Sequence, residues 1–191
     1  MEMFLILISS AFINNYVLVQ FLGVCPFFGV SKKTETALGM GLSVMFVMTF
    51  ATAMTFLFNR FILAPLGIEY LRTVAFILIV ASIVQFVEVF MKKTFRALYS
   101  MLGIYLPLIA TNCAIFGVVL INIRDEYSFT GAVVNSIGAG AGFTLAILLL
   151  AGIREKYDTN PDIPEIFKGF PLALFAAGLM SIAFMGFQGL V

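Results

Sequence analysis

The sequence predicts an all-α integral membrane protein that crosses the bilayer six times. Of its 191 residues, 62% are apolar and only 11% are charged, whereas soluble domains are about 45–50% apolar and about 25% charged. Five runs without any charged residue, each 23 to 29 residues long, divide the chain. About 20 apolar residues suffice to cross a bilayer as a helix. The net charge of +1 and the absence of histidine exclude a nucleic-acid-binding domain and any histidine-based site.

The five charge-free runs and one further segment define the six predicted spans. The further segment carries Arg72 near one end and Glu88 near the other, with 15 uncharged residues between them. Backbone groups in lipid must find their hydrogen bonds within the segment, so each span is predicted to be helical. The predicted spans are residues 3–24, 37–58, 70–91, 98–121, 131–153 and 170–189.

The first span is predicted to be interrupted. A straight helix over residues 3–30 would be about 42 Å long, which exceeds the hydrocarbon thickness of about 30 Å. We therefore expect a break or a re-entrant turn in its second half. Polar and helix-breaking residues are concentrated there: Asn14, Asn15, Gln20, Gly23 and Pro26.

The fourth span is also predicted to be interrupted. It contains Pro107, and Thr111 and Asn112 directly precede Cys113. Proline removes a backbone donor and kinks a helix. Backbone groups that are freed at this depth must line a cavity or be covered by protein, so the sequence predicts an irregular segment just before Cys113.

The distribution of basic residues predicts that both termini lie outside the cytoplasm. With six spans, the connections after the first, third and fifth spans share one side of the membrane. That side holds eight of the eleven Lys and Arg residues, and such an excess is typical of the cytoplasmic side. The eight are Lys32, Lys33, Lys92, Lys93, Arg96, Arg154, Lys156 and Lys168.

The two halves of the chain resemble each other. The motif C-x-x-F-G-V begins at Cys25 and again at Cys113, 88 residues later, and residues 38–41 match 137–140 at an offset of 99. Three spans are an odd number, so the second half is predicted to be inverted about a pseudo-two-fold axis in the membrane plane. We predict one membrane domain with two repeats: residues 1–191, with repeats at about 3–91 and 98–189.

The two cysteines, Cys25 and Cys113, occupy equivalent positions in these repeats. The sequence leaves three interpretations of this pair open: inert buried thiols, a disulfide, or ligands of a metal site. Four cysteine thiolates usually hold an iron–sulfur cluster. Two cysteines would therefore need two more ligands from a second chain, at a subunit interface. Zinc also accepts cysteine ligands but has no redox chemistry.

A family resemblance runs through essentially the whole chain. It is carried by NNYVLV at 14–19, FLGVCPF at 21–27, GVSKK at 29–33, LPLIATNCA at 106–114 and GLMSIAFMGF at 178–187. These segments closely resemble the RnfA/NqrE family. The resemblance is nearer to the RnfA branch, which serves ion-translocating ferredoxin:NAD oxidoreductase complexes, than to the NqrE branch of the sodium-pumping NADH:quinone reductase.

The resemblance implies a six-helix subunit that pairs with an inverted paralogue, RnfE or NqrD. Each chain would supply two cysteines to one [2Fe-2S] cluster inside the membrane, which makes Cys25 and Cys113 the ligands here. The cluster would relay electrons in a complex that couples ferredoxin oxidation and NAD reduction to export of sodium or protons across a bacterial or archaeal cytoplasmic (inner) membrane. Such a chain belongs to an enzyme complex but holds no complete active site. From the residues alone, a small secondary transporter with inverted repeats is the alternative.

Glu88 is the main acidic residue within a predicted span and the first candidate for an ion path. Ionisable residues are costly in the bilayer and often functional, and the family resemblance also supports a role in cation entry. The alternative is an interfacial ion pair with Lys92 at i+4. Four asparagines are weaker candidates that could equally bond across helices or to backbone at the breaks: Asn14, Asn15, Asn112 and Asn135.

Overall fold

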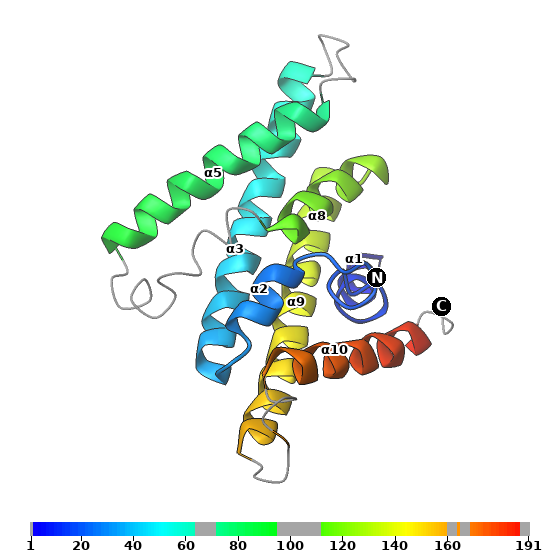
Figure 1. Ribbon diagram of the computed structural model, residues 1–191. Helices are drawn as coiled ribbons and strands as arrows, with labels where there is room; N and C mark the ends of the chain where they lie inside the picture. The colour runs from blue at the N-terminus through cyan, green and yellow to red at the C-terminus, as the bar shows by residue number, and fades with distance from the viewer. Residues whose placement is uncertain (1, 64–71, 95–111, 160–163, 165–168, 188–191) are drawn as a thin grey trace.

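Two long helices form the centre of the computed structural model, which describes residues 2–63, 72–94, 112–159, 164 and 169–187. They are α3 (Thr34–Phe58) and α9 (Phe129–Asp158), and they lie side by side in Figure 1. Both are long and apolar enough to cross a membrane, α3 together with the π-helical turn η2 (Asn59–Leu63) that extends it. The described residues contain helices and no strand, as the sequence predicts.

Helices α3 and α9 run antiparallel. A Cβ atom built on Gly41 would lie 2.6 Å from Thr144, and one on Gly140 would lie 2.6 Å from Met45. Further along, the hydroxyls of Thr52 and Ser136 form a hydrogen bond of 2.7 Å. Residue numbers therefore rise along one helix as they fall along the other. The glycines allow the two backbones to approach closely, which suits helix packing in a membrane.

The first predicted span consists of separate pieces. It begins with α1 (Glu2–Ile8) and the π-helical turn η1 (Ser9–Ile13), and helix resumes only at α2 (Val24–Val30). The predicted interruption is present, but a helix over the whole of 3–24 is wrong because residues 14–23 lie outside any helix. The segment contains two residues with left-handed backbone, Phe21 (φ 56°) and Gly23 (φ 80°).

The other face of α9 packs against α1 and η1. A Cβ atom on Gly138 would lie 2.9 Å from the Leu7 carbonyl oxygen, and one on Gly142 would lie 2.7 Å from the Ala11 carbonyl oxygen. The glycine run at 138–142 therefore allows α9 to contact the first segment and α3 at once.

Three further helices surround this centre: α5 (Arg72–Thr94), α8 (Cys113–Arg124) and α10 (Phe170–Met185). Each contacts the core along one stripe, because residues three or four apart share a helix face. Helix α10 crosses beside the C-terminal part of α9, and α5 lies against α3 (Figure 1). The buried stripe of α5 is Phe76, Val80, Ile83 and Val84, and that of α10 is Ala173, Ala176, Ala177 and Ser181.

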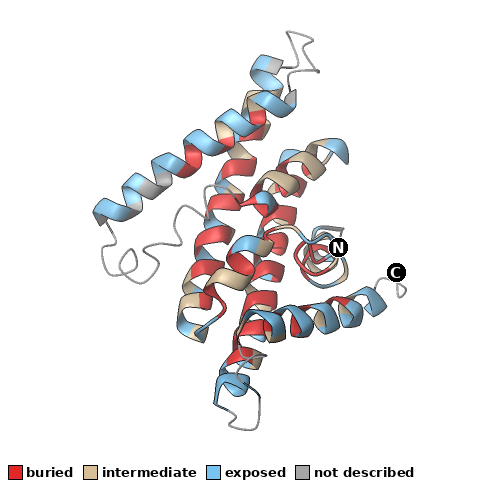
Figure 2. Ribbon diagram, in the orientation of Figure 1, coloured by how far each residue is buried: buried red, intermediate tan, exposed pale blue. Residues whose placement is uncertain are grey.

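The outer faces of these helices are apolar as well. Figure 2 shows that burial is concentrated on α3 and α9, while α5 and α10 are largely exposed. Large apolar side chains cover the exposed face of α10, among them Phe175 at 66% and Ile182 at 70% exposed. A soluble monomer rarely exposes such continuous apolar surface, whereas lipid or a membrane partner would cover it without cost.

The observed bounds differ from several predicted spans. The predicted span 131–153 is longer in the structure, since α9 continues to Asp158 and carries Arg154 and Lys156 on helix rather than on a loop. The first part of the predicted span 98–121, including Pro107, lies outside the described residues. The six-span count and the placement of the termini outside the cytoplasm stay predictions.

A buried network of polar side chains ties the helices together. Asn135 donates from Nδ2 to Asn122 Oδ1 (2.6 Å) and to the Tyr16 hydroxyl (3.3 Å). Asn122 in turn donates to Ser136 Oγ (3.2 Å), which is bonded to Thr52. The network joins α3, α8, α9 and the interrupted segment, which gives the apolar bundle a fixed register.

Candidate cysteine half-site

Cys113 is the first residue of α8, and the residue before it caps the helix. The side-chain oxygen of Asn112 accepts a hydrogen bond of 3.0 Å from the Ala114 backbone N–H. Asparagine is among the preferred N-cap residues because it satisfies a donor that the helix cannot. Helix α8 therefore has a well-defined start, while the predicted irregular segment before Asn112 lies outside the described residues.

Cys25 lies in the equivalent place on α2. It is the second residue of that helix, two residues after Gly23, whose left-handed φ of 80° turns the chain into the helix. Each cysteine is thus in the first turn of a helix.

The two cysteine segments are in direct contact. The backbone N–H of Gly23 donates a hydrogen bond to Cys113 Sγ at a distance of 2.9 Å. A Cβ atom on Gly23 would lie 3.0 Å from Asn112 Oδ1 and 3.1 Å from Phe143 Cε2. Only glycine meets both requirements here, a left-handed backbone and an approach this close. The fold brings together residues 90 positions apart.

Both cysteines are free and exposed. Within the described residues, no group of three or more His, Cys, Asp or Glu could hold a metal ion. Two exposed thiols are half of the four-cysteine set that usually binds an iron–sulfur cluster, so the metal-site interpretation stays a prediction.

One buried polar atom in the residue before Cys113 has no hydrogen-bond partner among the described residues. It is Nδ2 of Asn112, whose residue is only 4% exposed. An unsatisfied buried donor costs about 1–3 kcal/mol, and such atoms often mark a missing ligand or partner.

The asparagines predicted as ion-path candidates have different surroundings. Asn15 is fully buried: Nδ2 donates to the Ala11 and Gly142 carbonyls, and Oδ1 accepts from the backbone of Val17 and Leu18. Its whole hydrogen-bonding capacity is thus used on backbone at the break, which favours the structural alternative. Asn14 is exposed and makes one weak side-chain bond, 3.4 Å to Ser9.

Glu88 is on α5. Its side chain lies outside what the structure describes. Its role in an ion path therefore stays a prediction.

Two neighbouring residues near the end of α9 hold the connection between α2 and α3. Arg154 is buried and donates from Nη1 to the Phe28 carbonyl and to Ser31 Oγ, each at a distance of 2.9 Å. Glu155 accepts a bond of 2.9 Å from the Thr34 backbone N–H, at the start of α3. The predicted topology counts Arg154 among the basic residues of a connection, but both residues lie on α9. The change from apolar to charged residues at position 154, after 27 uncharged residues, does not mark the helix end, because α9 continues to Asp158.

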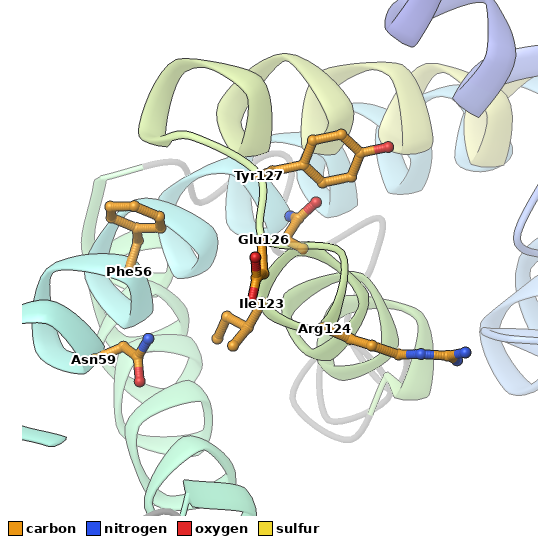
Figure 3. A pocket seen from close by; sticks show the side chains of 7 residues that line it. Phe56, Asn59, Ile123, Arg124, Glu126 and Tyr127 are labelled. Atoms are coloured by element: carbon orange, nitrogen blue, oxygen red, sulfur yellow. The ribbon is translucent and has the colours of Figure 1, made fainter. Parts of the chain in front are cut away.

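A separate polar cavity of about 460 Å³ opens at the other end of the helix pair. Phe56 and Asn59 face Ile123 and Glu126 across it, while the Arg124 side chain extends away (Figure 3). Neither cysteine lines it, and neither do the ion-path candidates of the sequence. The full lining is Phe56, Asn59, Asn122, Ile123, Arg124, Glu126 and Tyr127.

Comparisons with known proteins match this chain over its whole length, and they confirm the predicted family resemblance. The family described as "Rnf-Nqr subunit, membrane protein" matches residues 3–191. A component of the Na(+)-translocating ferredoxin:NAD(+) oxidoreductase complex of Acetobacterium woodii is 55% identical over 190 residues, which are 100% of this chain and 98% of that protein. The corresponding components of the ion-translocating oxidoreductase complexes from Thioalkalivibrio sulfidiphilus and Vibrio cholerae are 53% and 52% identical, with the same coverage.

Proposed function

This chain belongs to the Rnf-Nqr family of membrane subunits, and from that membership we propose that it relays electrons inside an ion-motive complex. It is an integral membrane protein, as its apolar exterior requires. The proposed complex carries electrons from ferredoxin to NAD and couples them to export of sodium or protons. The names of the similar subunits support this assignment over a quinone reductase.

The observation that carries the proposal is the contact between the two cysteine segments. The Gly23 N–H to Cys113 Sγ bond holds two helix starts together, and both thiols are exposed. In the proposal Cys25 and Cys113 supply two ligands of a [2Fe-2S] cluster, which provides one-electron redox chemistry when bound. The Nδ2 donor of Asn112, in the residue directly before Cys113, has no partner among the described residues.

A partner chain completes the proposed site, since this chain supplies only half of the ligands. The partner is an inverted paralogue of the RnfE type, which would cover the exposed thiols. The outer faces of α5 and α10 are apolar. A membrane protein can dock on such faces without removing polar groups from water. Other membrane and soluble subunits of the complex would carry electrons to and from this site.

The proposed inverted repeat is supported by paired contacts between α3 and α9. Gly41 and Met45 correspond to Gly140 and Thr144 at the offset of 99 residues. Gly41 approaches Thr144, and Gly140 approaches Met45. The same contact thus occurs twice with the two repeats exchanged, as an approximate two-fold axis between the helices would require.

The cluster is tested by purifying the complex without oxygen and measuring iron, acid-labile sulfide and the EPR spectrum after reduction. Wild type, Cys25→Ser and Cys113→Ser are compared. We expect a two-iron signal that is lost in both variants. An unchanged signal in either variant, or no iron attributable to this pair of subunits, would remove the electron-relay role and favour a transporter with inverted repeats.

The ion path through Glu88 is a separate part of the proposal. Glu88→Gln keeps the shape of the side chain and removes its charge. We expect weaker dependence of turnover on sodium while the two-iron EPR signal is retained. Sodium dependence equal to wild type would assign Glu88 to the interfacial alternative.

A further inference from the structure

The short helix that carries Cys25 is held at its far end by a buried arginine. Helix α2 has only seven residues, and helices this short do not form without support from tertiary contacts. Arg154 donates from Nη1 to two groups at the end of α2. One is the carbonyl of Phe28 in the last turn of the helix, and the other is the hydroxyl of the C-cap residue Ser31. These bonds satisfy groups that the helix end leaves open.

The two ends of α2 are thus fixed by two different regions. The residue before the helix, Gly23, is bonded to Cys113, and the last turn is bonded to Arg154 on α9. Cys25 lies between these two attachments, three residues before Phe28. Loss of the arginine bonds would leave the last turn of α2 held by the buried side chains of Phe27 and Val30 and by the hydroxyl of Thr36, which donates to the Val30 carbonyl. The helix would thus be held less firmly, and we expect Cys25 to gain more motion than Cys113.

Arg154 also brings a positive charge close to the half-site. It is only 8% exposed, and both of its acceptors are neutral oxygens, a carbonyl and a hydroxyl. About one helical turn separates Phe28 from Cys25, so the charge lies on the order of 10 Å from that cysteine. A buried cation at this range favours the more negative, reduced state of a redox centre, because screening is weak there.

We propose that Arg154 is a positioning residue for the cysteine half-site, which it orders through α2 and whose redox centre it biases toward reduction. The first effect concerns the chain itself, and the second rests on the proposed function. Arg154 makes no contact with the cysteines among the hydrogen bonds of the described residues. Its action is therefore indirect, through the backbone of α2 and through its charge.

The test compares Arg154→Gln and Arg154→Lys with a matched control, Lys156→Gln. The control removes the same charge from an exposed position on the same helix. Two measurements are made. The full chain in membranes is treated with N-ethylmaleimide, and the labelling rates of Cys25 and Cys113 are compared. The purified complex is titrated by EPR to obtain the potential of the two-iron centre.

We expect Arg154→Gln to raise the ratio of Cys25 to Cys113 labelling several-fold. At a fixed ambient potential it should lower the ratio of reduced to oxidised centre by roughly tenfold, or about 59 mV for a one-electron couple. Arg154→Lys should retain the potential, because the charge remains. It should raise the labelling ratio, because the lysine side chain is shorter and does not bring its nitrogen to the place of Nη1, which donates both bonds. Lys156→Gln should match wild type in both measurements.

The outcomes separate the two proposals. A labelling ratio equal to wild type in Arg154→Gln overturns the positioning role, and Arg154→Lys decides this point if the glutamine variant does not accumulate. An unchanged potential with an intact centre overturns the charge effect. If wild type has no two-iron centre, the proposed function fails, and the labelling ratio still tests the positioning of Cys25.

Discussion

The α3–α9 pair and the cysteine half-site are built in opposite ways. In the helix pair, glycines allow close approach and polar side chains such as Thr52 and Ser136 bond to each other. At the half-site, two thiols are exposed and a buried amide nitrogen of Asn112 has no partner among the described residues. The helix pair satisfies its polar groups within one chain, whereas the half-site leaves groups that, under the proposed function, a cofactor and a second chain would cover.

The largest expected loss of stability is in the α3–α9 pair. Gly140→Leu would place a side chain where a Cβ atom is already 2.7 Å from the Met45 backbone. Overpacking against backbone cannot relax, so we expect a loss of about 3 kcal/mol or more and little folded subunit. Thermal unfolding in detergent and the yield of assembled complex measure it. Gly152→Ala is the control, because nothing lies within 4 Å of its added Cβ.

A smaller loss of stability is expected at Asn15, which lies in the interrupted first segment and bonds to α9. Asn15→Ala removes four buried hydrogen bonds and leaves the Val17 and Leu18 N–H groups without their acceptor. We expect a loss of stability of about 3 kcal/mol, seen as a lower midpoint of thermal unfolding. Asn14→Ala, which removes one exposed bond, should be nearly neutral. A stable Asn15→Ala variant with altered sodium dependence would instead support an ion-path role.

Gly23→Ala should damage the half-site and spare the helix pair. A left-handed backbone costs an L-residue about 1–2 kcal/mol, and the new Cβ would press on Asn112 and Phe143. We expect lower iron content per complex, with the α3–α9 core still folded by its resistance to proteolysis. Gly178→Ala, at a position with open space around the added Cβ, serves as the control. Full iron content in Gly23→Ala would contradict the importance of this contact.

The smallest effect on stability is expected from Asn112→Ser, which sharpens the comparison most. Serine caps a helix about as well as asparagine, so the cap on α8 is retained while the amide donor is removed and no charge is buried. The unfolding midpoint should change by an amount corresponding to less than about 1 kcal/mol. The EPR spectrum or potential of the assembled complex should nevertheless change. If neither changes, the unpaired nitrogen does not face the redox centre.

The sequence predicts a good part of this architecture from local patterns. Charge-free runs locate α3 and α9, and the polar residues after Asn14 predict the break in the first segment. The repeated motif singles out Cys25 and Cys113. Each of these signals depends on residues close together in the chain, such as a run of apolar side chains or a helix-breaking group.

Other features depend on contacts between distant residues and are not predictable in this way. The bond between Gly23 and Cys113 joins positions 90 apart. Sequence patterns group Arg154 with the loop charges, because a lone arginine after an apolar run usually marks a span's end. Its burial becomes visible only when α2 is placed beside α9. The left-handed backbone of Phe21 has no sequence signal at all.

The exposure of both thiols has a consequence for how the complex is made. A chain that presents two free cysteines on its own surface cannot enclose a cofactor before its partner has docked. Under the proposed function, subunit pairing therefore comes before cofactor delivery during biogenesis. The unpaired chain would also be the stage most vulnerable to oxidation, since exposed cysteines are the ones that oxidants reach first.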